Sequence, residues 1–221
     1  MKRLAVLLVV LAAATVVGVA GSGYASVVRD PTETKPSHMG ACHTAKVTPA
    51  CRRGALADFD RARAKEGLGP MRLPSNFARL TVPEQILVLT DIDRTDRGLR
   101  PVLGLARALQ PYAQAGANRG DDPRFPAWTR AGGANWASGA NALMDEFLWM
   151  YDDGPGLNLD CPAAGSPGCW GHRHNILRRY PGPLLMGAGH GRRGDTQLFL
   201  GDDHHDRANL FTWAHERSYF H

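Results

Sequence analysis

The chain has 221 residues, of which 43% are hydrophobic and 21% are charged, with a formal net charge of +5 at pH 7. The apolar content is sufficient for a hydrophobic core. The positive excess is mild and scattered along the chain rather than gathered in a basic cluster, so composition argues against a nucleic-acid-binding protein.

The first 25 residues have the order of a secretory signal peptide. Lys2 and Arg3 form a basic start, residues 4–19 are almost wholly apolar, and small residues lead up to Ala25, where we expect cleavage. A single membrane anchor is the alternative, but the apolar run falls short of the roughly 20 residues that a spanning helix needs. We therefore expect a secreted, extracellular protein that contacts the membrane only transiently, through its signal peptide.

Residues 26–52 are rich in Pro, Thr, Lys and Ser and poor in large apolar side chains. This composition predicts a flexible leader that contains a short disulfide loop. The remaining residues 53–221 have a size typical of one domain.

The chain contains four cysteines, Cys42, Cys51, Cys161 and Cys169. An even number of cysteines in an exported chain predicts disulfides. Of the three possible pairings, Cys42–Cys51 and Cys161–Cys169 are favoured because each closes a short loop. A zinc site is the alternative, but zinc-binding cysteines are usually separated by roughly two to four residues, and neither pair has that spacing.

Residues 53–66 carry apolar side chains at near-helical spacing and predict an amphipathic helix. A second helix is expected to begin at Thr81, which forms a capping box with Glu84, and to end at Gly98.

A third helix is predicted from Pro101 onward, with Pro111 able to kink or split it. Its apolar stripe consists of Val102, Leu105, Leu109 and Tyr112. A fourth helix is predicted to begin at Ser138 or Asn141. Its apolar face consists of Leu143, Phe147, Met150 and Tyr151.

The last third of the chain has the pattern of strands at residues 184–189, 196–201 and 209–215, separated by turn-forming segments. Helices followed by an antiparallel meander predict an α+β domain with helices packed on the sheet.

Several kinds of catalytic site are absent from the sequence. There is no Gly-x-Ser-x-Gly nucleophile motif. His215-Glu216 is not followed by a histidine at the position that the His-Glu-x-x-His motif of zinc proteases requires. The acidic and histidine-rich residues 202–206 could bind a metal, but they fall in a predicted turn, where such clusters are usually solvated.

The most informative segment is the Cys161–Cys169 loop and the run Gly-His-Arg-His-Asn-Ile-Leu that follows it at residues 171–177. A helical turn there would send His172 and His174 to different sides, so we expect only one of them to face a cleft. The alternative is that His172 is a buried structural histidine bonded to the backbone.

This run is similar to the Gly-His-Arg-x-Asn-Ile element of the CAP superfamily (cysteine-rich secretory, antigen 5 and pathogenesis-related 1 proteins) in its bacterial, SCP-like extracellular branch. Two further segments resemble elements of that family, Asp93-Arg94 with Gly98-Leu99-Arg100-Pro101, and Trp149-Met150-Tyr151-Asp152. The resemblance spans roughly Thr81 to Trp213. It implies a three-layer α-β-α sandwich.

The resemblance also implies a cleft built from two histidines and two acidic residues, which in some members binds a divalent metal. His172 and Asp152 match two of these positions. Asn135, or Ala134 before it, stands where a carboxylate is expected, and residues 121–123 offer no histidine. The altered set argues against a metal site, so no cofactor is expected, with a divalent metal as the alternative.

The resemblance implies binding of a lipid or cell-envelope component in a cleft near His172, without established catalysis. The cleft candidates are His172, Asp152, Asn135 and Trp149. The alternatives are a secreted hydrolase that uses Asp152 and His172, and a purely structural envelope protein. A short carboxylate–imidazole distance beside a concave pocket would favour a binder or an enzyme.

Overall fold

The structure is a computed structural model, and it describes residues 30–156, 158–201 and 209–220. The helices of this part are α1 (Pro49–Lys65), α2 (Val82–Thr95), α3 (Gln110–Arg119), α4 (Ala142–Tyr151), α5 (Gly171–Leu177) and α6 (Trp213–Glu216). The strands are β1 (Gly104–Ala106), β2 (Ala131–Ala137), β3 (Leu184–Gly191), β4 (Gly194–Gly201) and β5 (Asn209–Thr212). Short 3-10 turns lie at Met39–Ala41, Phe77–Arg79 and Arg217–Tyr219.

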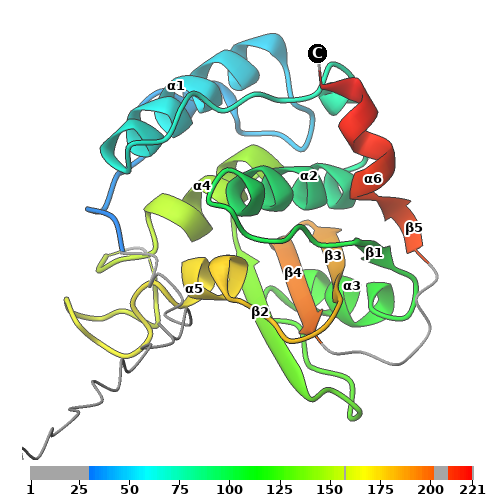
Figure 1. Ribbon diagram of the computed structural model, residues 1–221. Helices are drawn as coiled ribbons and strands as arrows, with labels where there is room; N and C mark the ends of the chain where they lie inside the picture. The colour runs from blue at the N-terminus through cyan, green and yellow to red at the C-terminus, as the bar shows by residue number, and fades with distance from the viewer. Residues whose placement is uncertain (1–29, 157, 202–208, 221) are drawn as a thin grey trace, which may run out of the picture.

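One mixed sheet lies between helices, in the strand order β2-β4-β3-β1-β5. Helices α2, α4 and α5 cover one face, α3 covers the other, and α1 forms an outer layer over α2 and α4 (Figure 1). The predicted α+β class with helices around a small sheet is confirmed. The prediction of a wholly antiparallel meander is wrong, because β1 runs parallel to β3 and lies between β3 and β5, which makes the sheet mixed.

The helix predicted from Pro101 is wrong in its first half. Gly104–Ala106 is strand β1, in which Leu105 pairs with the buried Met186 of β3. Helix α3 begins only at Gln110, with Pro111 in its first turn, where the missing N–H of proline costs no hydrogen bond. The apolar residues that appeared to follow one helical spacing therefore belong to two elements, a buried strand and the start of a helix.

The other predicted helices are present, with local caps. Thr48 caps α1, where its Oγ1 accepts a hydrogen bond from Cys51 N at 3.1 Å, so this helix begins earlier than predicted. At α2 the Glu84 carboxylate accepts from Thr81 N at 2.7 Å. Asn141 caps α4 through Met144 N at 3.2 Å.

The main core lies between the sheet and the layers of α1, α2 and α4. Phe59 of α1 meets Phe147 and Tyr151 of α4 edge to face, with ring centroids 5.3 and 6.0 Å apart. A smaller core lies under α3 on the opposite face of the sheet, where Leu109 and Ala113 pack with strand leucines. These two cores fix the relative positions of α4 and the sheet.

Both predicted disulfides, Cys42–Cys51 and Cys161–Cys169, are present. The first joins the N-terminal segment to α1, because Cys51 lies in that helix. The expected signal peptide lies outside the described residues. Among the described helices, none is long and apolar enough to cross a membrane.

The described part of the segment predicted as a flexible leader packs against the domain; we call residues 30–47 the N-terminal arm. Thr34 N donates to Tyr151 O at 2.8 Å, and Asp58 of α1 accepts from the backbone N atoms of Ser37 and His38 at 2.9 and 2.7 Å. Composition alone suggested mobility, but these contacts place the arm beside the end of α4.

Candidate functional site

A cavity of about 330 Å³ opens where the C-terminal end of α4 meets the N-terminal end of α5 and the segment after α3. We call it the α4–α5 cavity. Its larger apolar side chains are Trp136, Leu148, Trp149 and Leu159. Its ionisable side chains are His172, Asp121, Asp122, Asp152, Asp153 and Asp160. Three of the predicted cleft residues, His172, Asp152 and Trp149, therefore line one cavity.

His172 is paired with Asp153, the neighbour of the predicted partner Asp152. Its Nδ1 lies 2.6 Å from Asp153 Oδ1, and Asp153 Oδ2 accepts from the backbone N atoms of His172 and Arg173 at 2.9 and 3.2 Å. One carboxylate thus caps α5 and orients the imidazole. Since Nδ1 is engaged, Nε2 is the ring nitrogen left for the cavity.

The electrostatics around His172 favour its charged form. Burial lowers the pKa of His172. The hydrogen bond and charge of Asp153, together with the charges of Asp122 and Asp160, raise it by more than burial lowers it, so the net shift is upward. The His172 side chain is 17% exposed and that of Asp153 is 1% exposed. The imidazole is therefore held in place while one edge remains open to a ligand.

The turn before His172 has a strained backbone. Trp170 has a φ of 62°, a left-handed conformation that is uncommon for a non-glycine residue. Its backbone N donates to Asp153 O at 2.9 Å, and Asn158 Nδ2 donates to the same oxygen at 3.0 Å. Asp153 therefore organises the turn after the disulfide loop through its main chain as well as its side chain.

Helix α5 is fixed by buried arginines. Arg173 bonds Glu66 Oε2 at 2.6 Å and Met150 O at 2.8 Å. Arg94 Nη1 donates to Ile176 O at 2.5 Å at the other end of the helix. These bonds of Arg173 and Arg94 hold the seven-residue helix α5 against its neighbours.

Asn135 does not line the cavity. It is fully buried, donates to Gln197 Oε1 at 2.8 Å and to His172 O at 3.2 Å, and accepts from Asn175 Nδ2 at 2.9 Å. Gln197 in turn donates to Glu146 Oε2 at 2.9 Å. Asn135 therefore connects α5 to the sheet, and the structure does not place it among the residues that line the cavity.

Asp152 forms a carboxyl pair with Glu33 of the N-terminal arm. Burial raises the pKa of Asp152 to about 7, with the side-chain hydrogen bond and charge of Glu33 adding to the shift and Lys35 opposing it. The residue is 2% exposed. Glu33 of the N-terminal arm therefore lies next to Asp152 at the edge of the cavity.

Asp122 is a second unusual acid in the cavity. Burial raises its pKa to about 6, with Asp121 and Asp160 adding to the shift and His172 opposing it. Residues 121–123 offer no histidine, and the structure places Asp122 of this segment in the cavity, where its charge acts on His172. Asp153 and Glu33 had no sequence signal of their own, because tertiary packing alone brings them to the cavity.

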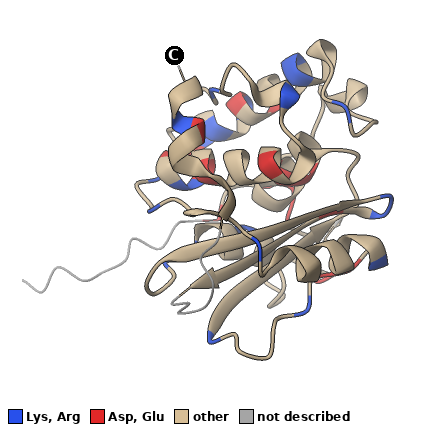
Figure 2. Cartoon of the chain, turned by 90° about the vertical axis from the view of Figure 1, so that its right-hand side faces the viewer, with Lys and Arg blue, Asp and Glu red and all other residues tan. Residues whose placement is uncertain are grey.

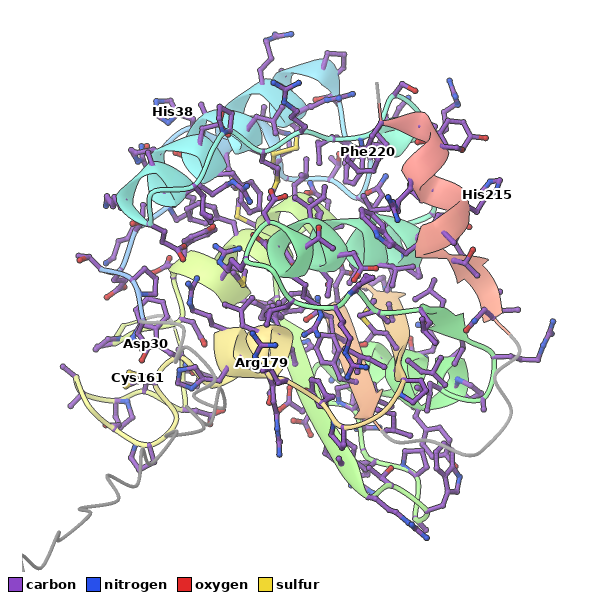
Figure 3. The ribbon with its side chains drawn as sticks, in the orientation of Figure 1. Asp30, His38, Cys161, Arg179, His215 and Phe220 are labelled. Atoms are coloured by element: carbon purple, nitrogen blue, oxygen red, sulfur yellow. A yellow bond between two sulfur atoms is a disulfide. The ribbon has the colours of Figure 1, made fainter. Side chains whose placement is uncertain are left out.

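His174 points away from His172, as the helical turn predicts. Its Nε2 lies 2.7 Å from Asp30 Oδ1, and its side chain is largely exposed. Figure 3 shows Asp30 and Cys161 on the same side of α5. His174 therefore contacts the N-terminal arm.

The described residues contain no group of three or more His, Cys, Asp or Glu side chains arranged to hold a metal ion. The acidic and histidine-rich residues 202–206 lie outside the described part. Figure 2 shows Lys and Arg at several separate places on the chain rather than in one patch.

No protein-family model matches this chain, and searches of curated proteins and of solved structures found no match either. The resemblance to the CAP superfamily therefore stays a prediction that rests on the motifs quoted above.

Proposed function

We propose that the protein is a secreted, CAP-like domain that binds a lipid or another cell-envelope component in the α4–α5 cavity, without catalysing a reaction. The observation that carries this proposal is one cavity of about 330 Å³ in which apolar side chains adjoin an oriented imidazole. Ligand pockets commonly combine an apolar lining with a few placed polar groups, and this volume lies at the small end of their range.

The architecture supports binding over a purely structural role for His172. The alternative required an imidazole bonded to the backbone, whereas the ring is bonded to the Asp153 carboxylate and lines a cavity. The two disulfides are consistent with an oxidising compartment, as expected of a secreted protein.

Thermal unfolding of the mature protein with single-chain lipids that carry anionic, neutral or ammonium headgroups, and with soluble peptidoglycan fragments, tests this proposal. A compound that binds only the folded state raises the melting temperature. The variant Ser138→Trp places a bulky side chain at an exposed position of the cavity lining and should abolish the shift. No shift with any compound, or an equal shift in this variant, would contradict binding in the cavity.

A hydrolase is the second candidate, favoured by the 2.6 Å contact between His172 Nδ1 and Asp153 Oδ1. In this mechanism Nε2 of neutral His172 removes a proton from water as the water oxygen bonds to the carbonyl carbon of the ester or amide. Asp153 stabilises the imidazolium, which then gives the proton to the alcohol or amine that leaves as its bond to that carbon breaks. The pairing replaces Asp152 of the sequence hypothesis with Asp153. Release of product from ester or amide probes by the wild type, lost in His172→Gln, would establish it; no turnover above that variant would exclude it for those probes.

A further inference from the structure

The charge of the α4–α5 cavity is opposite to that of the chain. Five aspartates line the cavity, and His172 is the one side chain among its described lining residues that can carry a positive charge, although the whole chain carries a formal charge of +5. Carboxylates grouped in a concave site strengthen the local negative potential and attract cations. An anionic headgroup would be repelled from the same place.

The carboxylates differ in what they already bind. Asp153 is engaged by His172 and the start of α5, and Asp152 is paired with Glu33. Asp121, Asp122 and Asp160 remain at the more exposed side of the cavity. Their charges are spread along two chain segments, which suits a large cation better than a small ion that needs several oxygens at about 2.0–2.6 Å.

A second, independent feature is the indole of Trp149. This side chain lines the cavity and is 1% exposed, yet its Nε1 has no hydrogen-bond acceptor among the described residues. A buried N–H without an acceptor is costly, and a ligand oxygen would satisfy it. The indole therefore indicates a ligand that carries an acceptor atom.

A second indole supplies the surface that organic cations prefer. Trp136 lines the cavity, and its Nε1 donates to Arg193 O at 3.1 Å, which orients the ring. Indole faces attract quaternary and protonated amines, and the attraction is stronger where water is excluded. Leu148 and Leu159 extend the apolar lining for the rest of the molecule.

We propose that the α4–α5 cavity binds a small organic cation, an ammonium group on an apolar body that also carries an acceptor oxygen. The ammonium group lies between Trp136 and the carboxylates of Asp122 and Asp160, and the oxygen accepts from Trp149 Nε1. This inference rests on the proposed function, of which it specifies the ligand class. The ligand enters from solution as a free molecule, since the cavity is too small for a whole two-chain lipid.

Isothermal titration calorimetry with two isosteric probes tests the inference. The probes are the butanoate ester of choline and 3,3-dimethylbutyl butanoate, in which carbon replaces the charged nitrogen. The wild type should bind the cation at least about tenfold more tightly than the neutral ester. Equal affinities, or no binding of either probe, would overturn the cation inference, whereas the proposed binding function is tested separately by the thermal-unfolding panel.

Variants locate the bound cation. Asp122→Asn combined with Asp160→Asn should weaken the choline ester about tenfold and leave the neutral ester unchanged, because only the charge is removed. Glu84→Gln, at the start of α2, is the matched control and should change neither affinity. Cation binding that survives the double variant, or binding to phosphatidylcholine vesicles without binding of the soluble ester, would overturn the proposal.

Discussion

The contact between Asp153 and His172 yields the sharpest stability prediction. The substitution Asp153→Asn keeps the size of the side chain and removes its charge. The carboxylate faces four N–H donors, from the His172 ring, the backbone of His172 and Arg173, and the side chain of Asn158. An amide can accept at only one of its two positions, so at least one buried donor loses its partner.

The magnitude follows from these bonds. A charge-assisted hydrogen bond contributes about 1.5–3 kcal/mol and a neutral one about 1 kcal/mol, and a buried donor left without a partner costs a further 1–3 kcal/mol or so. Because His172 is 17% exposed, the ion-pair part is at the lower end. We expect Asp153→Asn to lower the free energy of unfolding by about 2–4 kcal/mol at pH 5.5.

The pH dependence separates charge from packing. The pKa of His172 is raised in the folded state, so its stabilising charge is fully present below the unfolded pKa of about 6.5 and is lost as pH rises through the folded value. The deficit of the variant should therefore be smaller at pH 9 than at pH 5.5. Urea unfolding at both values measures it, with Glu84→Gln at the start of α2 as control. Equal deficits at both values, or none beyond that of the control, would refute the reasoning.

Three further predictions follow from the same structure. Asp152→Asn should raise the free energy of unfolding at pH 8 by about 1–2 kcal/mol and change it little at pH 4.5, because it removes the acid whose pKa burial and Glu33 raise to about 7; a loss of stability at pH 8 in urea unfolding would contradict this. Cys161→Ser with Cys169→Ser opens a loop of sequence separation 8 and should cost about 2.5 kcal/mol in thermal unfolding, with the variant insensitive to reductant; an unchanged melting temperature would count against it. Asn135→Ala should cost about 2 kcal/mol yet leave probe affinity unchanged, since this side chain lies behind the cavity; a selective loss of binding in calorimetry would restore it to the cleft.

The sequence predicted those features of the fold that depend on neighbouring residues, namely helix caps and short disulfide loops. The capping pair Thr81–Glu84 marked the start of α2, because a cap needs only neighbouring residues, whereas the start of α4 was left between Ser138 and Asn141 and the structure places the cap at Asn141. The disulfide pairing was also predictable from loop length. By contrast, Leu105 and Leu109 have the same apolar spacing in a helix and across a strand followed by a helix, and the pairing of β1 with β3 decided between them.

The candidate site was predicted only in part, for a similar reason. His172 and Trp149 line the cavity, and the motifs that singled them out are local. Whether Asp152 or Asp153 pairs with His172 depends on the backbone turn at Trp170. The spacing of apolar residues in the sequence does not reveal the conformation of that turn. Glu33 reaches the site from a segment whose composition indicated flexibility.

The most direct test of the account is a nuclear magnetic resonance titration of the His172 ring with and without the choline ester. If the cation lies in the α4–α5 cavity, its charge disfavours the imidazolium, so saturation with the probe should lower the pKa of His172. The neutral isostere should leave that pKa unchanged. Saturable binding of the cation with no change in the pKa of His172 would place the ligand elsewhere and contradict the central claim.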